Sequence, residues 1–359
     1  MKIEGYRSYH VSKPLKQKLV NSVYCIENME HVLLEIYAEG FTGIGHVYAF
    51  SPSHAQSLKI LVDSYCESLI GKDVDLVKKH WNDLYIRINS IGQTGLQIIA
   101  LSAIDTALWD IMSQGAKLPL YKMLGAMRNE VDVYASGGWL GTLESLVEEA
   151  INYKEQGFKK YKMKIGSPDY REDIKRVAAV RKALGDDIEV MVDANQGLSI
   201  KKAISVSKEL MNMDVTWFEE PIFAQDYSAN AELVNLTDIS IVSGESLFTK
   251  TEHLEIMTRR GVDILNPDLQ RCGGVTEFMN VATMAAAFRI PVSSHLFTEI
   301  SAHLIAAAPT GTILENVPEW WAGVFEKAPK IKDGKIKLDD TPGLGITFDH
   351  DFINKYKYE

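Results

Sequence analysis

The chain has 359 residues, 46% of them hydrophobic and 24% charged, with a formal net charge of −10. This length exceeds one ordinary domain and suits a barrel with an added domain. The acidic balance argues against nucleic acid as a partner, and no long apolar run or basic cluster suggests a membrane partner.

The first part of the chain has the pattern of an α+β domain. Residues 2–9 and 29–39 alternate apolar and polar side chains, which predicts antiparallel strands with a hairpin turn at Gly40–Gly43. Helical patterns follow over residues 53–70, 74–88 and 95–115. Ser51 and Pro52 are typical of the start of the first helix. We assign residues 1–126 to this domain.

From about residue 131 the pattern changes to alternating strands and helices. Eight such strands predict a parallel barrel over residues 127–317. The turn-rich tail, residues 318–359, is expected to pack back on the first domain. The predicted strands span 131–136, 161–166, 188–193, 215–220, 239–244, 262–267, 290–294 and 310–315.

One polar residue lies at or just beyond the carboxyl end of seven of these strands. The intervals between them run from 20 to 29 residues, about the length of one strand–helix unit. Such strand ends form the active site of a barrel. The residues are Lys164, Asp193, Glu219, Glu245, Asp268, His295 and Glu315.

Two lysines share one face of the second barrel strand. Lys162 and Lys164 are two residues apart, so both side chains point the same way. An edge strand with solvated lysines is one interpretation. The other is a pair in the barrel mouth, where each cation disfavours protonation of its neighbour and an amine serves as a base near neutral pH.

Three acids come from adjacent strands. Asp193, Glu219 and Glu245 would repel one another unless a cation lies between them, and three oxygen ligands favour Mg²⁺. Alone, each would be a helix cap or a loop charge. Glu219 is preferred to Glu220 because it shares a face with Trp217. Asn195 is a candidate substrate contact, with a plain turn role equally open.

Asp268 and His295 end the sixth and seventh strands. A carboxylate beside an imidazole orients the ring and raises its pKa, which favours proton transfer over a structural role for His295. Glu315 ends the eighth strand. If burial and neighbouring acids keep it neutral, it can donate a hydrogen bond to a substrate oxygen.

These groups suit removal of a proton next to a carboxylate. A divalent cation stabilises the resulting enediolate, and Lys164 or His295 takes the proton according to the face that carries it. Return of a proton to the same carbon racemises it. Protonation of a β-hydroxyl by His295 releases water instead.

The motifs KMK, VDANQ, EEP, GES, NPDLQRCGGVTE, SSHLFTEISAHL and ILEN resemble the mandelate racemase subgroup of the enolase superfamily. The resemblance covers essentially the whole chain. It implies an N-terminal α+β capping domain on a modified (β/α)₇β TIM barrel. It also implies Asp193, Glu219 and Glu245 as magnesium ligands, Lys164 as base beside Lys162, an Asp268–His295 dyad, Glu315 as electrophilic acid and Ser136 as a substrate contact.

Several segments depart from mandelate racemase itself. The lid candidates are about residues 14–30 and 46–54, and the first of them is more polar than a valine-rich lid. Ala194 stands in place of a tyrosine, and Arg271 stands in place of a lysine. These departures argue against mandelate as the substrate. The segments DLQRCGGVTE and VDANQ resemble those of relatives that dehydrate sugar acids, so we expect a sugar-acid dehydratase, with a 2-hydroxy-acid racemase or epimerase as the alternative. A third hypothesis is a non-catalytic barrel with a binding or scaffold role. The presence of all seven polar strand ends argues against it, because such a chain would be expected to have lost some of them.

The sequence also bears on location and assembly. The three cysteines, Cys25, Cys66 and Cys272, have no motif spacing, which fits reduced thiols in a cytoplasm, and no signal peptide is visible. The resemblance implies a homo-oligomer. The expected ligand is a small hydroxy acid.

Overall fold

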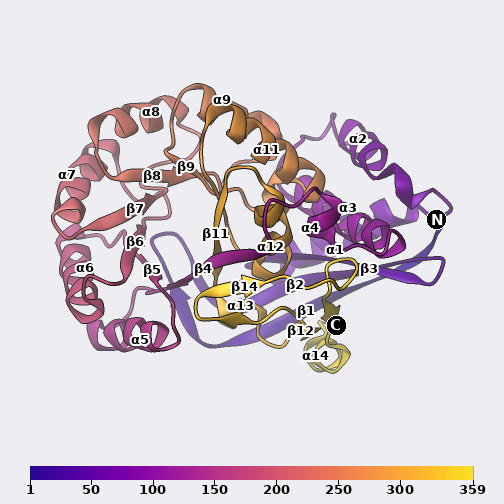
Figure 1. Ribbon diagram of the computed structural model, residues 1–359, viewed down its shortest axis with the longest axis horizontal. Helices are drawn as coiled ribbons and strands as arrows, with labels where there is room; N and C mark the ends of the chain where they lie inside the picture. The colour runs from indigo at the N-terminus through magenta and orange to yellow at the C-terminus, as the bar shows by residue number, and fades with distance from the viewer. Residues whose placement is uncertain (359) are drawn as a thin grey trace.

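The N-terminal part of the chain forms an α+β domain beside a barrel (Figure 1). The computed structural model describes residues 1–358. Three antiparallel strands pair in the order β1-β2-β3, and helices α1 and α3 pack on them. The elements are β1 (Ile3–Val20), β2 (Cys25–Ala38), β3 (Phe41–Ala49), α1 (Pro52–Glu67), the 3₁₀ helix η1 (Val74–Leu76), α2 (Val77–Arg87), α3 (Leu96–Gly115) and α4 (Leu120–Met123).

The start of α1 follows the predicted capping pattern. The Ser51 side chain accepts a hydrogen bond from the His54 backbone N–H, and Pro52 occupies the first turn. The turn between β2 and β3 lies at Glu39 and Gly40, which both have positive φ. Gly43 lies within β3 and not in the turn. Glycine is required there because a Cβ would lie 2.1 Å from the Ala107 carbonyl oxygen of α3.

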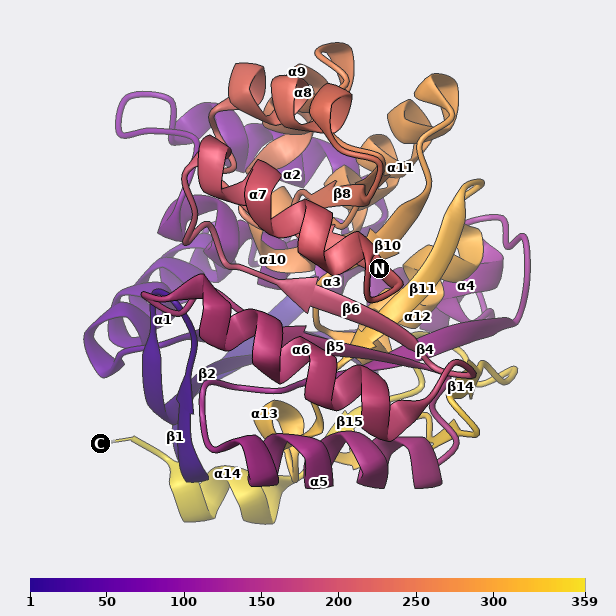
Figure 2. The same cartoon turned by 90° about the vertical axis from the view of Figure 1, so that its left-hand side faces the viewer.

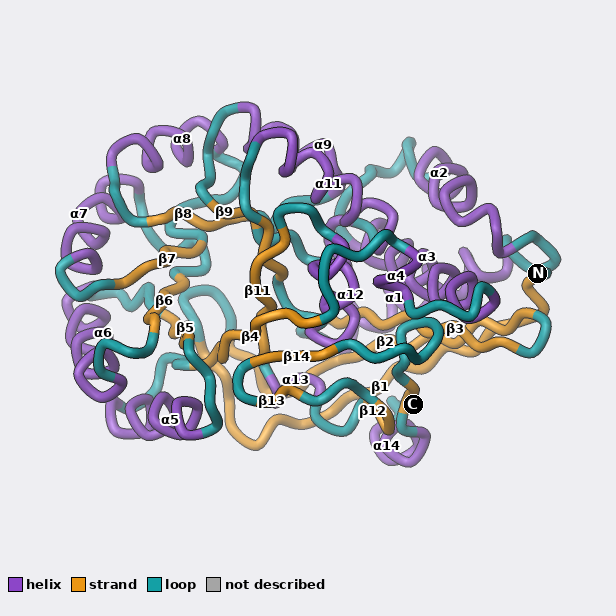
Figure 3. Tube along the Cα trace, in the orientation of Figure 1, coloured by secondary structure: helices purple, strands orange, loops and turns teal. Residues whose placement is uncertain are grey.

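The barrel has eight parallel strands, and pairing of β11 with β4 closes it. Helices lie outside the strands, as Figures 1 and 3 show. The strands are β4 (Glu130–Gly137), β5 (Lys160–Lys164), β6 (Glu189–Asp193), β7 (Val215–Glu219), β8 (Ser240–Ser243), β9 (Ile264–Leu265), β10 (Val292–Ser294) and β11 (Gly311–Asn316). The helices are α5 (Leu143–Glu155), α6 (Tyr170–Leu184), α7 (Ile200–Met211), α8 (Tyr227–Leu236), α9 (Thr249–Thr258), α10 (Leu269–Cys272), α11 (Val275–Phe288) and α12 (Thr298–Ala307).

A layer of large side chains fills the barrel interior. Alternation along each strand places these residues inward and the aliphatic majority outward, against the helices. The inward layer is the floor on which the polar strand ends rest. Its buried members are Tyr134, Met191, Trp217, Val242 and Ile313.

The lid candidate at 14–30 is the far end of a long hairpin. Strands β1 and β2 continue to Val20 and Cys25, with a register shift between Pro14 and Leu19. The hairpin reaches the barrel, where the Ser22 hydroxyl donates to the Ala194 carbonyl over 2.8 Å. The second candidate, 46–54, includes the end of β3 and the start of α1.

The tail, residues 318–358, contacts both domains. Strand β14 (Lys335–Lys337) pairs antiparallel with β4, and α14 (His350–Tyr356) lies against β1 at the edge of the capping sheet (Figure 2). The Tyr358 backbone N–H donates to the His10 carbonyl over 2.8 Å. The remaining elements are α13 (Pro318–Trp321), β12 (Phe325–Lys327), β13 (Ile331–Lys332) and β15 (Thr347–Phe348).

Helix α3 is long and apolar enough to cross a membrane by length and composition. In this fold, 78% of its apolar window is buried inside the protein. It packs on β3 and α1 as the core helix of the capping domain. Its hydrophobicity is therefore accounted for by internal packing.

Candidate active site

Three carboxylates meet at the carboxyl ends of β6, β7 and the loop after β8. Strand register places Asp193 opposite Glu219, and Glu245 follows β8 by two residues. One oxygen from each lies within 4.8 Å of the others, and all three side chains are buried. Oxygen-only donors at this spacing fit a hard divalent cation such as Mg²⁺.

Electrostatics support the same interpretation of this triad. Burial raises the pKa of Glu219 and of Glu245, and repulsion from Asp193 adds to the effect. The second oxygen of Glu245 accepts no hydrogen bond, although His295 Nε2 lies 3.2 Å away. A buried acceptor without a donor is costly, and a bound cation would satisfy it.

Glu219 and Glu220 point to opposite faces of β7, as alternation along the strand predicts. Glu219 faces inward and accepts from the Trp217 indole over 2.7 Å. Glu220 accepts from the Ser246 hydroxyl over 2.8 Å, on the other side of the strand. Glu220 therefore takes no part in the triad.

Both predicted lysines point into the barrel, which removes the edge-strand alternative. Lys162 Nζ lies 2.6 Å from Glu219 and 2.9 Å from Glu315, and Lys164 pairs with Asp193. Burial alone would lower the pKa of each amine, but nearby carboxylates outweigh burial and raise both pKa values. For Lys164, Asp193 and the other acids also outweigh the opposing effect of Lys162. The lysine pair by itself does not produce a neutral amine here.

His295 and Asp268 form the predicted hydrogen-bonded pair. His295 Nδ1 lies 2.6 Å from an Asp268 carboxylate oxygen. Burial lowers the pKa of His295, but Glu245, Asp268 and Glu315 outweigh it and raise the pKa to about 9. His295 Nε2 is left facing Glu245 and the site.

Glu315 differs from the expectation of a neutral acid. Burial raises its pKa, but Lys162, His295 and Lys164 outweigh burial and leave the pKa well below the ordinary value. Its carboxylate also accepts from the Leu296 backbone N–H over 3.1 Å. The neighbouring cations therefore favour the charged form of Glu315, an effect that the sequence pattern did not reveal.

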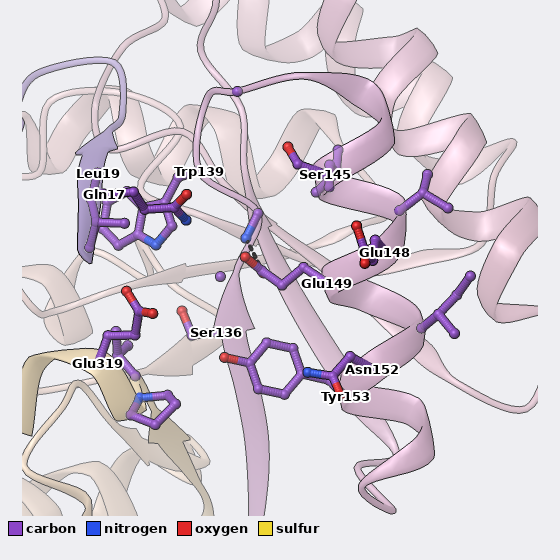
Figure 4. A pocket seen from close by; sticks show the side chains of 18 of the residues that line it. Gln17, Leu19, Ser136, Trp139, Ser145, Glu148, Glu149, Asn152, Tyr153 and Glu319 are labelled. Atoms are coloured by element: carbon purple, nitrogen blue, oxygen red, sulfur yellow. Dashed lines mark hydrogen bonds between the residues drawn. The ribbon is translucent and has the colours of Figure 1, made fainter. Parts of the chain in front are cut away.

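Asn195 and Ser136 occupy different surroundings. Asn195 donates twice to Asp193, from its backbone N–H over 2.7 Å and from its side chain over 3.0 Å, while its own amide oxygen is unpartnered. It can thus hold a triad member and offer an acceptor to a ligand. Ser136 lines a cavity of about 900 Å³ beside Trp139 and Glu319 (Figure 4).

Aromatic rings cover the site on the capping side. The Trp139 ring lies over Lys164, with 5.3 Å from Nζ to the ring centroid, and stacks on Trp320 at 6.0 Å. Tyr48 and Phe50 of the capping domain adjoin Trp320. The buried Tyr48 hydroxyl has no hydrogen-bond partner, so it is available to a bound ligand.

Sequence reasoning missed Trp139 and Arg176. Arg176 lies on the buried stripe of α6 with Val177, Val180 and Leu184. Its position on that stripe is a signal, because a charged residue on the apolar face of a helix needs buried partners. Those partners are backbone carbonyls, which no motif reveals.

Fold and site together define a class: a parallel-barrel enzyme with an oxygen-ligand metal site, a lysine and a histidine–aspartate pair. Residues 6–125 match the mandelate racemase/muconate lactonizing enzyme N-terminal domain, and residues 145–352 match the enolase C-terminal domain-like family. The chain belongs to the mandelate racemase/muconate lactonizing enzyme family of the enolase superfamily.

Similar proteins include dehydratases and a racemase. L-talarate/galactarate dehydratase of Salmonella typhimurium is 34% identical over 86% of this chain and 78% of its own length. Arabinonate dehydratase of Saccharolobus solfataricus is 32% identical over 92% and 91%. The former enzyme's structure, liganded with Mg and L-lyxarohydroxamate, has a TM-score of 0.95 at 30% identity, covering 100% of this chain and 93% of that one.

A racemase from Streptomyces coelicolor with bound magnesium is equally similar in fold. It has a TM-score of 0.95 at 30% identity, covering 99% of this chain and 100% of that one. Similar solved structures of this family thus hold magnesium. The three buried carboxylates of this chain meet the requirement for the same ion.

Proposed function

We propose that this chain is a magnesium-dependent dehydratase of a sugar acid. The main support is the buried site itself. Asp193, Glu219 and Glu245 come from strands that lie between β5, which carries Lys164, and β10, which precedes His295. Similarity to L-talarate/galactarate and arabinonate dehydratases supports the substrate class. The ligand is accordingly a small hydroxy acid.

Asp193, Glu219 and Glu245 are the proposed metal ligands. Magnesium held there would supply the positive charge that stabilises an enediolate. Asn195 keeps Asp193 oriented through two hydrogen bonds. Lys162 forms ion pairs with Glu219 and Glu315, which limits the repulsion among the carboxylates of the site.

Lys164 and His295 are the proposed proton carriers. They come from β5 and from just after β10, on either side of the strands that supply the three acids. A cation bound by Asp193 and Glu245 would offset the carboxylates that raise the pKa of Lys164 and of His295, and so would favour their neutral forms. In its neutral form, one of them takes the α-proton from the carbon next to the substrate carboxylate, leaving an enediolate. His295 then gives a proton to the β-hydroxyl, which leaves as water, and the enol becomes a 2-keto-3-deoxy acid.

Asp268 and Glu315 support these steps. Asp268 orients His295 through its bond to Nδ1, so that Nε2 faces the reacting groups. Glu315 lies 3.9 Å from His295 Nε2 and 2.9 Å from Lys162 Nζ, where it balances both cations. Ser136 and the free oxygen of Asn195 are proposed substrate contacts.

A library of acid sugars with Mg²⁺ tests the proposal. We expect semicarbazide to trap a 2-keto product, and Lys164→Ala and His295→Asn to abolish its formation. Lys160→Ala is the matched control, because Lys160 lies on the same strand and pairs with Glu189 at the surface. Wild-type rates in both site variants would refute the base assignments.

Racemisation or epimerisation is the second candidate, favoured by two proton carriers on different strands. In that case the opposite group returns a proton to the same carbon. Optical rotation would change without loss of water, and no 2-keto acid would form. The same library therefore separates the two reactions.

We also propose a cytoplasmic homo-oligomer. Exposed apolar side chains on and after α2, Ile86 and Ile91, support an assembly surface, and the three cysteines are unpaired. Sedimentation equilibrium tests the assembly, and a single 40.2 kDa species would refute it. Fractionation of the source cells tests the compartment, and recovery outside the cytoplasm would refute it.

A further inference from the structure

We propose that Arg176 is a positioning residue that fixes Lys164, and with it the substrate face that Lys164 serves, by binding two barrel loops at once. The inference rests on the proposed function, since it concerns which face of the α-carbon exchanges its proton. Arg176 lies on α6, and it contacts the backbone carbonyl of Lys164 rather than its amine. Its effect is exerted through the backbone.

The Arg176 guanidinium binds three carbonyls. Nη1 donates to the Lys164 carbonyl over 2.8 Å, and Nη2 donates to those of Gly138 and Trp139 over 3.0 Å each. The Lys164 backbone N–H donates to the same Gly138 carbonyl over 3.1 Å. One planar group thus ties the end of β5 to the loop after β4, a geometry that a lysine cannot reproduce.

Burying this cation has a cost that the fold offsets only in part. Arg176 is 8% exposed, and its nearest carboxylate, Asp173, is 3.6 Å away. Asp173 is itself occupied by the backbone N–H groups of Gly166 and Ser167, each over 2.9 Å. A buried charge held mainly by carbonyls favours a positional role over a simple contribution to stability.

The same bonds hold the ring above Lys164. Trp139 follows Gly138, so the bonds to both carbonyls anchor the backbone that carries the indole, which lies 5.3 Å from Lys164 Nζ. Helix α5 holds the loop from the other side, where Glu149 accepts the Gly138 N–H over 2.7 Å (Figure 4). Arg176 therefore determines both the backbone and the cover of this amine.

His295 is held independently of Arg176. Its ring binds Asp268, and its backbone N–H donates to the Pro267 carbonyl over 3.2 Å. The hydrogen bonds of Arg176 all end on the loop after β4 and on Lys164. Loosening Arg176 should therefore impair one proton carrier and leave the other intact.

The experiment compares α-hydrogen exchange in D₂O for the two C2 epimers of the reacting acid, with Mg²⁺ and the full chain. Lys164→Ala identifies the epimer that depends on Lys164, and His295→Asn the one that depends on His295. In Arg176→Met we expect kcat for Lys164-dependent exchange to fall about 100-fold, with KM changed less, because a displacement of about 1 Å costs that much. His295-dependent exchange should stay within about twofold.

Arg181→Met is the matched control. Arg181 lies on the same helix and also binds backbone carbonyls, those of Met213, Gly185, Ile188 and Asp214, away from Lys164. It should lower the melting temperature without separating the two epimers. Arg176→Lys keeps the buried charge but loses the planar fork, so the comparison is made on it if Arg176→Met does not fold.

Equal losses for both epimers in the Arg176 variants, or no loss for either, would overturn the inference. So would a wild-type chain whose exchange never depends on Lys164. A wild-type chain that exchanges neither epimer overturns the proposed function itself, and the wild-type rate alone identifies that case. Selective loss of the Lys164-dependent epimer supports the positioning role.

Discussion

Asp268 and His295 are joined through both backbone and side chain: they form a parallel backbone bridge, and Nδ1 lies 2.6 Å from the carboxylate. Two strand ends that are 27 residues apart in the chain are thereby held as one unit. The ring cannot rotate without breaking the side-chain bond. The direction of Nε2 is thus determined before any ligand binds.

Asp268→Asn should lower kcat by about 10²–10⁴-fold, the usual contribution of a positioned acid–base group. The amide keeps the size of the side chain but no longer stabilises a protonated ring. Steady-state rates on the true substrate measure the effect. Asp263→Asn is the control, because Asp263 accepts from the Ile241 N–H outside the site; equal losses in both variants would contradict the assignment.

Magnesium should stabilise the folded chain through the acid triad. At a hundredfold excess over Kd, one bound ion adds about 2.7 kcal/mol to the free energy of unfolding. Glu219→Gln should reduce this gain, while Glu220→Gln, its neighbour on the opposite face, should retain it. Thermal denaturation with Mg²⁺ or with EDTA measures both, and an unchanged gain in Glu219→Gln would reject that ligand.

Gly45→Ala should destabilise the capping domain. A Cβ at this position would lie 2.1 Å from the Ala103 carbonyl oxygen, so β3 and α3 would have to separate. Overpacking of this kind costs about 1–3 kcal/mol. Gly5→Ala is the control, since the nearest atom to its Cβ is 3.9 Å away. Urea denaturation compares the two, and equal midpoints would show that the sheet yields without strain.

Two histidines should make the fold sensitive to acid. His31 Nδ1 and His46 Nε2 lie 3.0 Å apart. Burial lowers the pKa of His46 to about 3, and burial together with His46 lowers the pKa of His31 well below its ordinary value. Unfolding lets both bind protons below about pH 6.5, so stability is full above that pH and falls as pH drops toward 3.

His46→Gln removes one of these protons. The slope of unfolding free energy against pH, between about pH 6 and 4, should decrease by up to about 1.4 kcal/mol per unit. Denaturant titrations at several pH values measure the slope. Identical slopes for wild type and variant would mean that His46 is already protonated in the folded chain.

The barrel and the converging strand ends were predictable because both follow from local patterns. Asp193 and Glu219 each end a short apolar strand, and parallel register alone then places them side by side. The closed eight-stranded barrel confirms the predicted fold class. The inward lysines also followed from alternation along one strand.

Charge states and backbone contacts were not predictable in this way. The negative charge of Glu315 depends on Lys162 and His295, which come from other strands and whose distances no spacing gives. The role of Arg176 depends on carbonyls, which every residue has. The hairpin around Ser22 is longer than its polar sequence suggested, because pairing of β1 with β2 supplies order that side-chain pattern does not show.

The contact of that hairpin with the barrel limits how freely this enzyme can diverge. Ser22 lies close to two glycines of the barrel. A Cβ at Gly166 would lie 2.8 Å from the Ser22 Cβ, and a Cβ at Gly197 would lie 2.9 Å from it. A chimera that takes its cap from a relative must therefore inherit matching glycines after β5 and β6. The capping hairpin and these two barrel loops must consequently change together during divergence, and neither can be exchanged as a separate module.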